Sequence, residues 1–96
     1  LGTLVSLNTL YLEDGTKTLK SGIINGKDLT VINELVIPST VETIEDNAID
    51  SIELTTIINK TGKAFDWNGI LGNDPSDTFE TGTVTTKNYG TVTITK

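Results

Sequence analysis

The sequence predicts a mainly β domain with a short N-terminal helix, in which a small solenoid-like stack of strands is closed by a C-terminal β-hairpin cap. Three observations lead to this expectation. Eighteen of the 96 residues are Thr, many of them beside Val or Ile, and β-branched side chains fit a pleated strand better than a helix. Apolar positions recur 22 residues apart in the middle of the chain, which is typical of a repeat stack. The last sixteen residues alternate around a Gly-containing turn, as a hairpin does.

Residues 1–28 are expected to form a helix or hairpin followed by a connector. Four leucines are spaced three apart, at Leu1, Leu4, Leu7 and Leu10. This spacing fits one face of a helix that ends near Leu12. Alternatively, Asp14-Gly15 is a type I′ turn that joins "LYLE" to "TKTL" in a hairpin. We favour the helix, because the leucine spacing fits a period of three better than a period of two.

Residues 29–71 are expected to form the repeat-like stack. "LTVINELVIP" is predicted to be a strand that Pro38 ends, since proline lacks the amide donor of a ladder. "STVETIEDNAI" alternates and then turns, which should place Ala48 and Ile49 inward. "IELTTIIN" is predicted to be the next strand. The 22-residue spacing matches Ile32, Leu35 and Ile37 with Leu54, Ile57 and Asn59.

The stretch "LVIPSTVETIEDNAI" resembles the BspA-like leucine-rich repeat of bacterial surface proteins, whose unit reads roughly L-x-x-V-x-I-P-x-S-V-x-x-I-G-x-x-A-F. The matching positions are Ile32, Leu35, Ile37, Pro38, Val41, Ile44 and Ala48. The chain departs from the unit at Glu45, where the family has Gly, and at Ile49, where it has Phe. The resemblance covers about residues 29 to 70 and implies packing positions without any chemistry.

Residues 72–96 are expected to form an acidic loop and the capping hairpin, within the same single domain. The repeat breaks down before this segment: Ala64-Phe65 is expected to take the place of Ala48-Ile49, and Phe65, Trp67, Ile70 and Leu71 are expected to form a short capping helix or turn. "TGTVTTKNYGTVTITK" is predicted to be a hairpin that turns at "KNYG". This ending resembles segments that follow such repeats in surface proteins of Gram-positive bacteria.

The composition removes several classes of function. The chain has no Cys and no His, so a thiolate nucleophile, a zinc site and an imidazole base are excluded. A net charge of −6 repels nucleic acid and anionic lipid, and no apolar run approaches the ~20 residues that span a bilayer. We therefore expect no catalytic residues, no cofactor, no nucleic-acid partner and no membrane contact by these residues.

Two candidate binding features remain. Asp74, Asp77 and Glu80 lie close together in "GNDPSDTFE", and carboxylate oxygens at this density are ligands that Ca²⁺ uses. The loop lacks the spacing of a calcium-binding loop, and Asx-Pro-Ser sequences form ordinary turns, so a solvated loop is the simpler expectation. Trp67 could anchor a partner, or it could fill the core.

Two functions compete at this stage. The resemblance to BspA-like repeats implies a non-catalytic extracellular module on the cell surface, for adhesion or contact with a protein or host ligand. The stretch "LNTLYLEDGTKTL" is similar to the place where type IV pilins leave their long N-terminal helix, through Tyr11, Glu13, Asp14 and Gly15. That likeness implies the exposed head domain of a filament subunit, with sister subunits as partners and residues 1–12 as the end of the helix.

Overall fold

The computed structural model describes residues 3–6, 8–25, 33–50, 54–87 and 90–96. Within them the chain is mainly β, as the sequence predicts, with a single short helix. The elements in chain order are β1 (Thr3–Ser6), β2 (Thr9–Leu12), β3 (Thr18–Leu19), β4 (Ile24–Asn25), β5 (Glu34–Ile37), β6 (Thr43–Ile44), β7 (Ile49–Asp50), β8 (Thr56–Asn59), α1 (Trp67–Ile70), β9 (Gly82–Thr85) and β10 (Thr91–Thr95).

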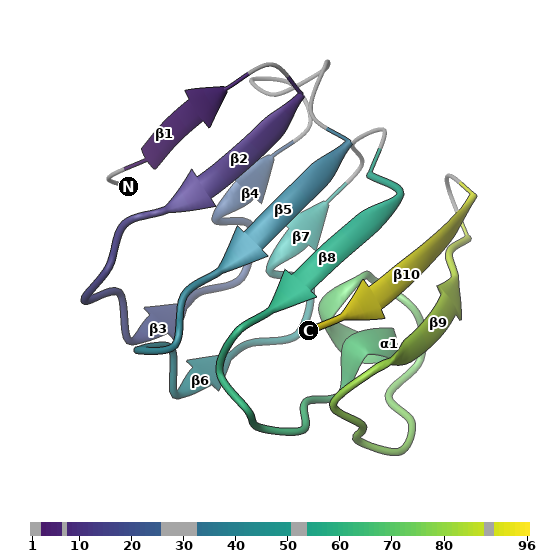
Figure 1. Ribbon diagram of the computed structural model, residues 1–96. Helices are drawn as coiled ribbons and strands as arrows, with labels where there is room; N and C mark the ends of the chain where they lie inside the picture. The colour runs from purple at the N-terminus through teal and green to yellow at the C-terminus, as the bar shows by residue number, and fades with distance from the viewer. Residues whose placement is uncertain (1–2, 7, 26–32, 51–53, 88–89) are drawn as a thin grey trace.

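Six of the strands form one sheet in the order β1-β2-β5-β8-β10-β9 (Figure 1). The four central strands run parallel, and each edge strand is antiparallel to its neighbour. Two short parallel pairs, β3–β6 and β4–β7, lie below and behind this sheet in the view of Figure 1. The chain thus leaves the sheet at β2, passes through two short strands, and returns as β5 beside the strand that it left.

The 22-residue spacing is confirmed where β5 pairs with β8. Leu35 is paired with Ile57, and Ile37 with Asn59. All four side chains are buried, so equivalent positions of the sequence lie side by side in neighbouring strands. The third expected match joins Ile32 to Leu54, and Ile32 lies outside the described residues.

A second offset, of 25 residues, relates the first coil to the next and was missed in the sequence. Leu10 is paired with Leu35, and Ile24 with Ile49. The connection from Ile24 to Leu35 is three residues longer than the connection from Ile49 to Ile57. This extra length shifts the period and hides the first coil from a search at constant spacing.

The N-terminal helix is wrong: residues 3–6 and 9–12 are the strands of an antiparallel hairpin. Leu10 and Leu12 are buried on the inner face of β2, while Tyr11 points outward. Leucines on two strands joined by a tight turn can thus imitate a helical spacing. The alternative hairpin is wrong too, because β3, which contains Leu19, pairs with β6 and not with β2. Gly15, with φ +96°, lies in the connection between β2 and β3.

The proline corner of the second coil agrees with its expected role. Pro38 directly follows β5, and its carbonyl accepts a hydrogen bond from the Val41 amide at 3.2 Å. Val41 and Ala48 are fully buried. Ile44 is only partly buried and packs against the core from its margin.

The connections outside the large sheet are also joined to one another by a line of backbone hydrogen bonds. The Gly22 amide donates to the Asn47 carbonyl, and the Asn47 amide donates to the Gly69 carbonyl, each at 2.8 Å. Gly22 and Asn47 have φ of +74° and +58°, a conformation that glycine and asparagine adopt most readily. The Gly69 carbonyl of helix α1 therefore extends this line of hydrogen bonds beyond Asn47.

The core lies between the large sheet and the elements behind it. Paired positions of the four parallel strands form a row of buried side chains that face the core: Leu10, Leu35, Ile57 and Ile94. Phe65 is buried at the end of this core, and Ala64 is exposed, so the expectation that Ala64 would replace Ala48 is wrong. The final hairpin of β9 and β10 is confirmed, and β10 pairs in parallel with β8.

Candidate interaction surface

Trp67, the sequence's candidate partner anchor, is a core residue. Its side chain is 0% exposed, and its Nε1 donates a hydrogen bond to the Phe79 carbonyl at 2.8 Å. Phe65 packs against it edge to face, with ring centroids 5.6 Å apart. A side chain that is buried and hydrogen-bonded in this way has no surface left for a partner, so that interpretation is wrong.

The acidic loop does not gather its carboxylates around one point. Asp74 lies 3.8 Å from the Lys87 ammonium, and Glu80 lies 3.6 Å from that of Lys96. Asp77 is exposed. In the part of the chain that the structure describes, no group of three or more acidic side chains is arranged to hold a metal ion. The three calcium candidates are thus placed as separate surface acids.

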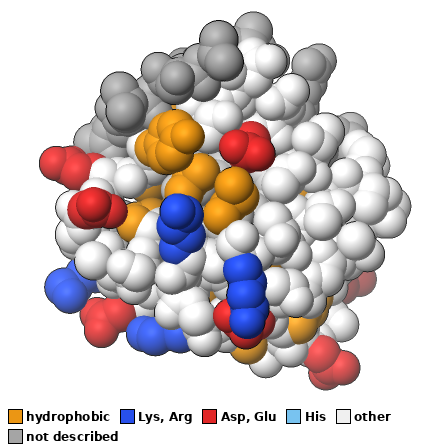
Figure 2. All heavy atoms as spheres, in the orientation of Figure 1, with side chains coloured by type: hydrophobic (Ala, Val, Ile, Leu, Met, Phe, Trp, Pro, Cys, Tyr) orange, Lys and Arg blue, Asp and Glu red, His pale blue; other side chains and the backbone are white. Residues whose placement is uncertain are grey.

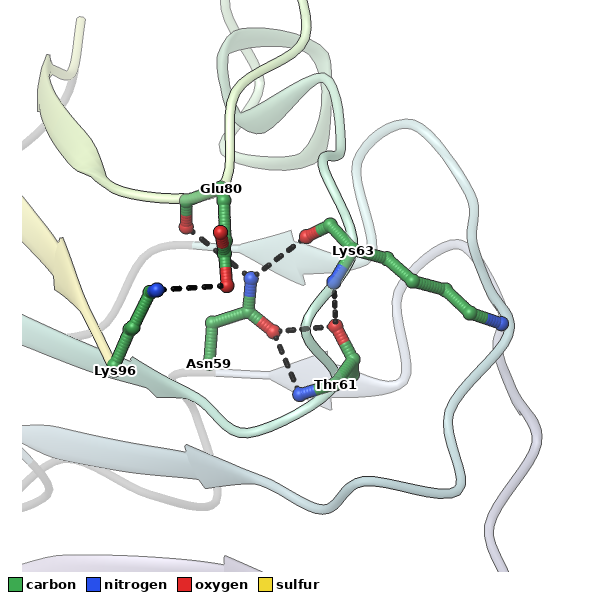
Figure 3. Close-up of polar contacts among 5 residues, drawn as sticks. All are labelled: Asn59, Thr61, Lys63, Glu80 and Lys96. Atoms are coloured by element: carbon green, nitrogen blue, oxygen red, sulfur yellow. Dashed lines mark hydrogen bonds and ion pairs between the residues drawn. The ribbon is translucent and has the colours of Figure 1, made fainter.

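The best-connected polar side chain is Asn59, which is 1% exposed and lies at the end of β8 (Figure 3). Its Nδ2 donates to the carbonyls of Lys63 and Glu80, at 3.0 and 3.2 Å. Its Oδ1 accepts from the amide and the hydroxyl of Thr61, at 3.1 and 2.6 Å. Both amide hydrogens and both lone pairs of the side chain are therefore used.

The Asn59 cluster holds two parts of the chain together, and every hydrogen-bonding group of the Asn59 side chain is used within it. It ties the turn after β8 to the segment before β9, at the position where the previous coil carries Ile37. The Lys96–Glu80 ion pair lies at its margin, with side chains 71% and 33% exposed.

The outer face of the six-stranded sheet is the surface with the most regular side-chain order. It faces the viewer in Figure 1, because β4, β7 and α1 lie behind the sheet. Along each central strand the side chains alternate, so every second residue points away from the core. The strand register then arranges these outward residues in rows that run across the sheet.

One outward row is apolar. It consists of Tyr11 on β2, Val36 on β5 and Ile58 on β8, and ends at Thr95 on β10. Tyr11 is 42% exposed, and Ile58 is partly buried. Val36 is only 6% exposed, although the core cluster does not include it. Figure 2 shows a patch of hydrophobic side chains on the front face of the molecule.

The adjacent outward row is rich in threonine. In register it runs through Thr83, Thr93, Thr56, Glu34 and Thr9. The hydroxyl of Thr9 donates to Glu34 at 3.1 Å. Thr83 and Thr93 are exposed. The outer face therefore combines a short apolar strip with a strip of hydroxyl groups that contains one carboxylate, on a chain whose net charge is −6.

This surface was not found in the sequence, although part of the pattern is present there. The 22-residue spacing that matches Leu35 with Ile57 also matches Val36 with Ile58. Tyr11 joins the row only through the 25-residue offset of the first coil. Without that offset, Tyr11 could not be placed beside Val36.

Comparisons with known proteins do not add to this picture: no family model, no curated protein and no solved structure matches the chain. Among the described residues, no helix is both long enough and apolar enough to cross a bilayer.

Proposed function

We propose that this chain is a non-catalytic extracellular surface module that contacts a protein or a host-surface ligand through the outer face of its sheet. The observation that carries the proposal is the row of Tyr11, Val36 and Ile58. An apolar strip on an exposed sheet, bordered by polar residues, is the arrangement expected of a contact surface. Tyrosine is also among the residues that most often anchor protein interfaces.

The fold-level part of the proposal is a short solenoid of the BspA-like type, closed by the β9–β10 hairpin as a cap. It is supported by the two offsets at which equivalent residues pair, Leu10 with Leu35 and Leu35 with Ile57. It is also supported by the parallel pairing of β10 with β8, which covers the last coil. Repeat stacks need such terminal units because the end of the stack would otherwise expose its core.

The assignment to a bacterial cell surface rests on two resemblances. Residues 29–70 resemble BspA-like repeats, and the last residues resemble segments that follow such repeats in surface proteins of Gram-positive bacteria. The pilin-like alternative required a helix at residues 1–12. Strands β1 and β2 occupy that segment, so no observation favours the alternative.

An adhesion assay tests this function. Beads coated with the protein are offered to epithelial cells and to immobilised matrix proteins, and retention is measured with and without competing soluble protein. We expect saturable retention that soluble wild-type protein competes away, and that the double substitution Tyr11→Ser with Ile58→Ser abolishes. Beads carrying Lys17→Gln with Glu42→Gln, which break an exposed ion pair elsewhere, should be retained like wild type. Retention that is equal for all three proteins, or absent for all, would contradict the proposed function.

A further inference from the structure

We infer, on the basis of the function proposed above, that the partner presents an extended segment of the form basic-x-apolar-x-basic to strands β2 and β5. The inference starts from two carboxylates on either side of the apolar row. Glu34 lies on β5, one outward position before Val36, and Glu13 follows Tyr11 by the same two residues at the end of β2. Each acid therefore borders the apolar strip on a different side.

The spacing of the two acids follows from the register. Glu34 is paired with Thr9, so Glu34 and Glu13 are four residues apart along the strand direction. At about 3.3 Å per residue this separation is about 13 Å, with the neighbouring strands about 4.8 Å apart. In an extended peptide, residues i, i+2 and i+4 point to the same side and cover the same distance. A basic residue at each end thus reaches a carboxylate while the middle side chain lies on Tyr11 and Val36.

The charge of these acids is not balanced by a cation of the described residues. The ion pairs found there join Lys17 to Glu42, Lys87 to Asp74 and Lys96 to Glu80. Glu13 is exposed, and Glu34 accepts only the neutral hydroxyl of Thr9. Figure 2 shows both acidic and basic side chains at the border of the hydrophobic patch. A complementary partner therefore carries positive charge at these two points.

Lys60 limits the position of the partner. This exposed lysine directly follows β8, and its amide donates to the Ile37 carbonyl at 3.1 Å. It lies two strands away from Glu13, about 10 Å across the sheet, and it repels a cation placed over β8. The charge pattern therefore positions a basic segment over β2 and β5, on the N-terminal side of the sheet.

Two capped peptides test the inference by NMR titration of the isotope-labelled protein. The first is Lys-Thr-Phe-Thr-Lys, and the second is its charge-reversed form Glu-Thr-Phe-Thr-Glu. We expect the basic peptide to shift the amides of residues 9–13 and 34–37, to bind about fivefold more tightly than the acidic one, and to lose this advantage at high salt. The double variant Glu13→Gln with Glu34→Gln should bind both peptides equally. The matched variant Glu42→Gln with Asp74→Asn should behave as wild type.

The outcomes separate this inference from the proposed function. If both peptides shift the same amides equally, or if neither shifts them, the basic partner class is overturned. The bead assay is independent of the peptides, so retention that depends on Tyr11 and Ile58 would then leave the contact function standing. If beads coated with the wild-type protein are not retained but the protein still binds the basic peptide selectively, the adhesion function is overturned and the inferred peptide specificity stands.

Discussion

The two halves of the molecule are held together in different ways. In the stacked half, from β2 to β8, backbone groups and apolar side chains repeat from one coil to the next, as in the hydrogen bonds from Gly22 to Asn47. In the C-terminal half, buried polar side chains add to the backbone pairing of β10 with β8. Asn59 binds the Glu80 carbonyl, and Trp67 binds that of Phe79. The C-terminal half thus adds hydrogen bonds of fully buried side chains to its backbone pairing.

The same difference affects how the halves depend on one another. Strands β2, β5 and β8 lie beside one another in parallel, with buried apolar side chains at paired positions. The C-terminal half has no such neighbour on its outer side, and β10 is joined to β8 on one edge and to β9 on the other. We therefore expect the stack to need the hairpin, and the hairpin to need the stack.

Removal of the hairpin should have the largest effect. A chain truncated after Thr81 keeps Phe79 and Glu80, whose carbonyls bind Trp67 and Asn59, and loses only β9 and β10. The edge of β8 and the inward side chains next to Ile94 would become exposed, and such edges aggregate. We expect insoluble or self-associated protein by size-exclusion chromatography. A soluble monomer with the wild-type melting temperature would show that the hairpin does not stabilise the stack.

The next largest effect should come from a charge placed in the stacked core. Ile37→Asp buries a carboxylate at a position that is 0% exposed, which should cost more than about 4 kcal/mol and unfold so small a domain. The matched substitution is Ile58→Asp on β8. Ile37 is paired with Asn59, and Ile58 directly precedes Asn59, so its side chain points to the outer face of the sheet. This substitution should cost about 1 kcal/mol or less. Equal losses in thermal denaturation would mean that the two faces are wrongly assigned.

A smaller effect is expected where the repeat ends. Asn59→Ile restores the residue type of the previous coil but leaves the Lys63 and Glu80 carbonyls without their donor. Unsatisfied buried groups cost about 1 to 3 kcal/mol each, so we expect a loss of about 2 to 4 kcal/mol in chemical denaturation. Lys96→Met breaks only the exposed ion pair at the margin and should change stability by about 0.5 kcal/mol or less. If Asn59→Ile is as stable as wild type, the polar cluster does not stabilise the fold.

The sequence predicted the middle of this fold and its C-terminal hairpin better than its N-terminal end. The β content, the strand that stops at Pro38 and the pairing of Leu35 with Ile57 follow from local patterns that repeat along the chain. The N-terminal hairpin could not be separated from a helix, because leucines on two short strands reproduce a spacing of three. The first coil stayed hidden because its connection to β5 is three residues longer than the next.

The candidate surface was harder to predict than the fold. The surface depends on which residues of different strands become neighbours. The first offset, 25 residues, is three residues longer than the second, and a search at 22 residues therefore does not place Tyr11 beside Val36. For Trp67 the sequence allowed both a partner anchor and a core residue, and the structure places it in the core. Here its Nε1 is satisfied by the Phe79 carbonyl, which makes complete burial possible.

Hydrogen exchange of the backbone amides tests most directly whether stack and hairpin form one structural unit. The measurement compares amides 92–94 of β10 with amides 35–37 of β5, in the intact wild-type chain. Because β10 is paired on both edges, its amides should show protection within about 1 kcal/mol of those in β5, and both should be lost together as denaturant is added. Exchange of amides 92–94 at the rate of an unstructured chain, while amides 35–37 stay protected, would contradict the account.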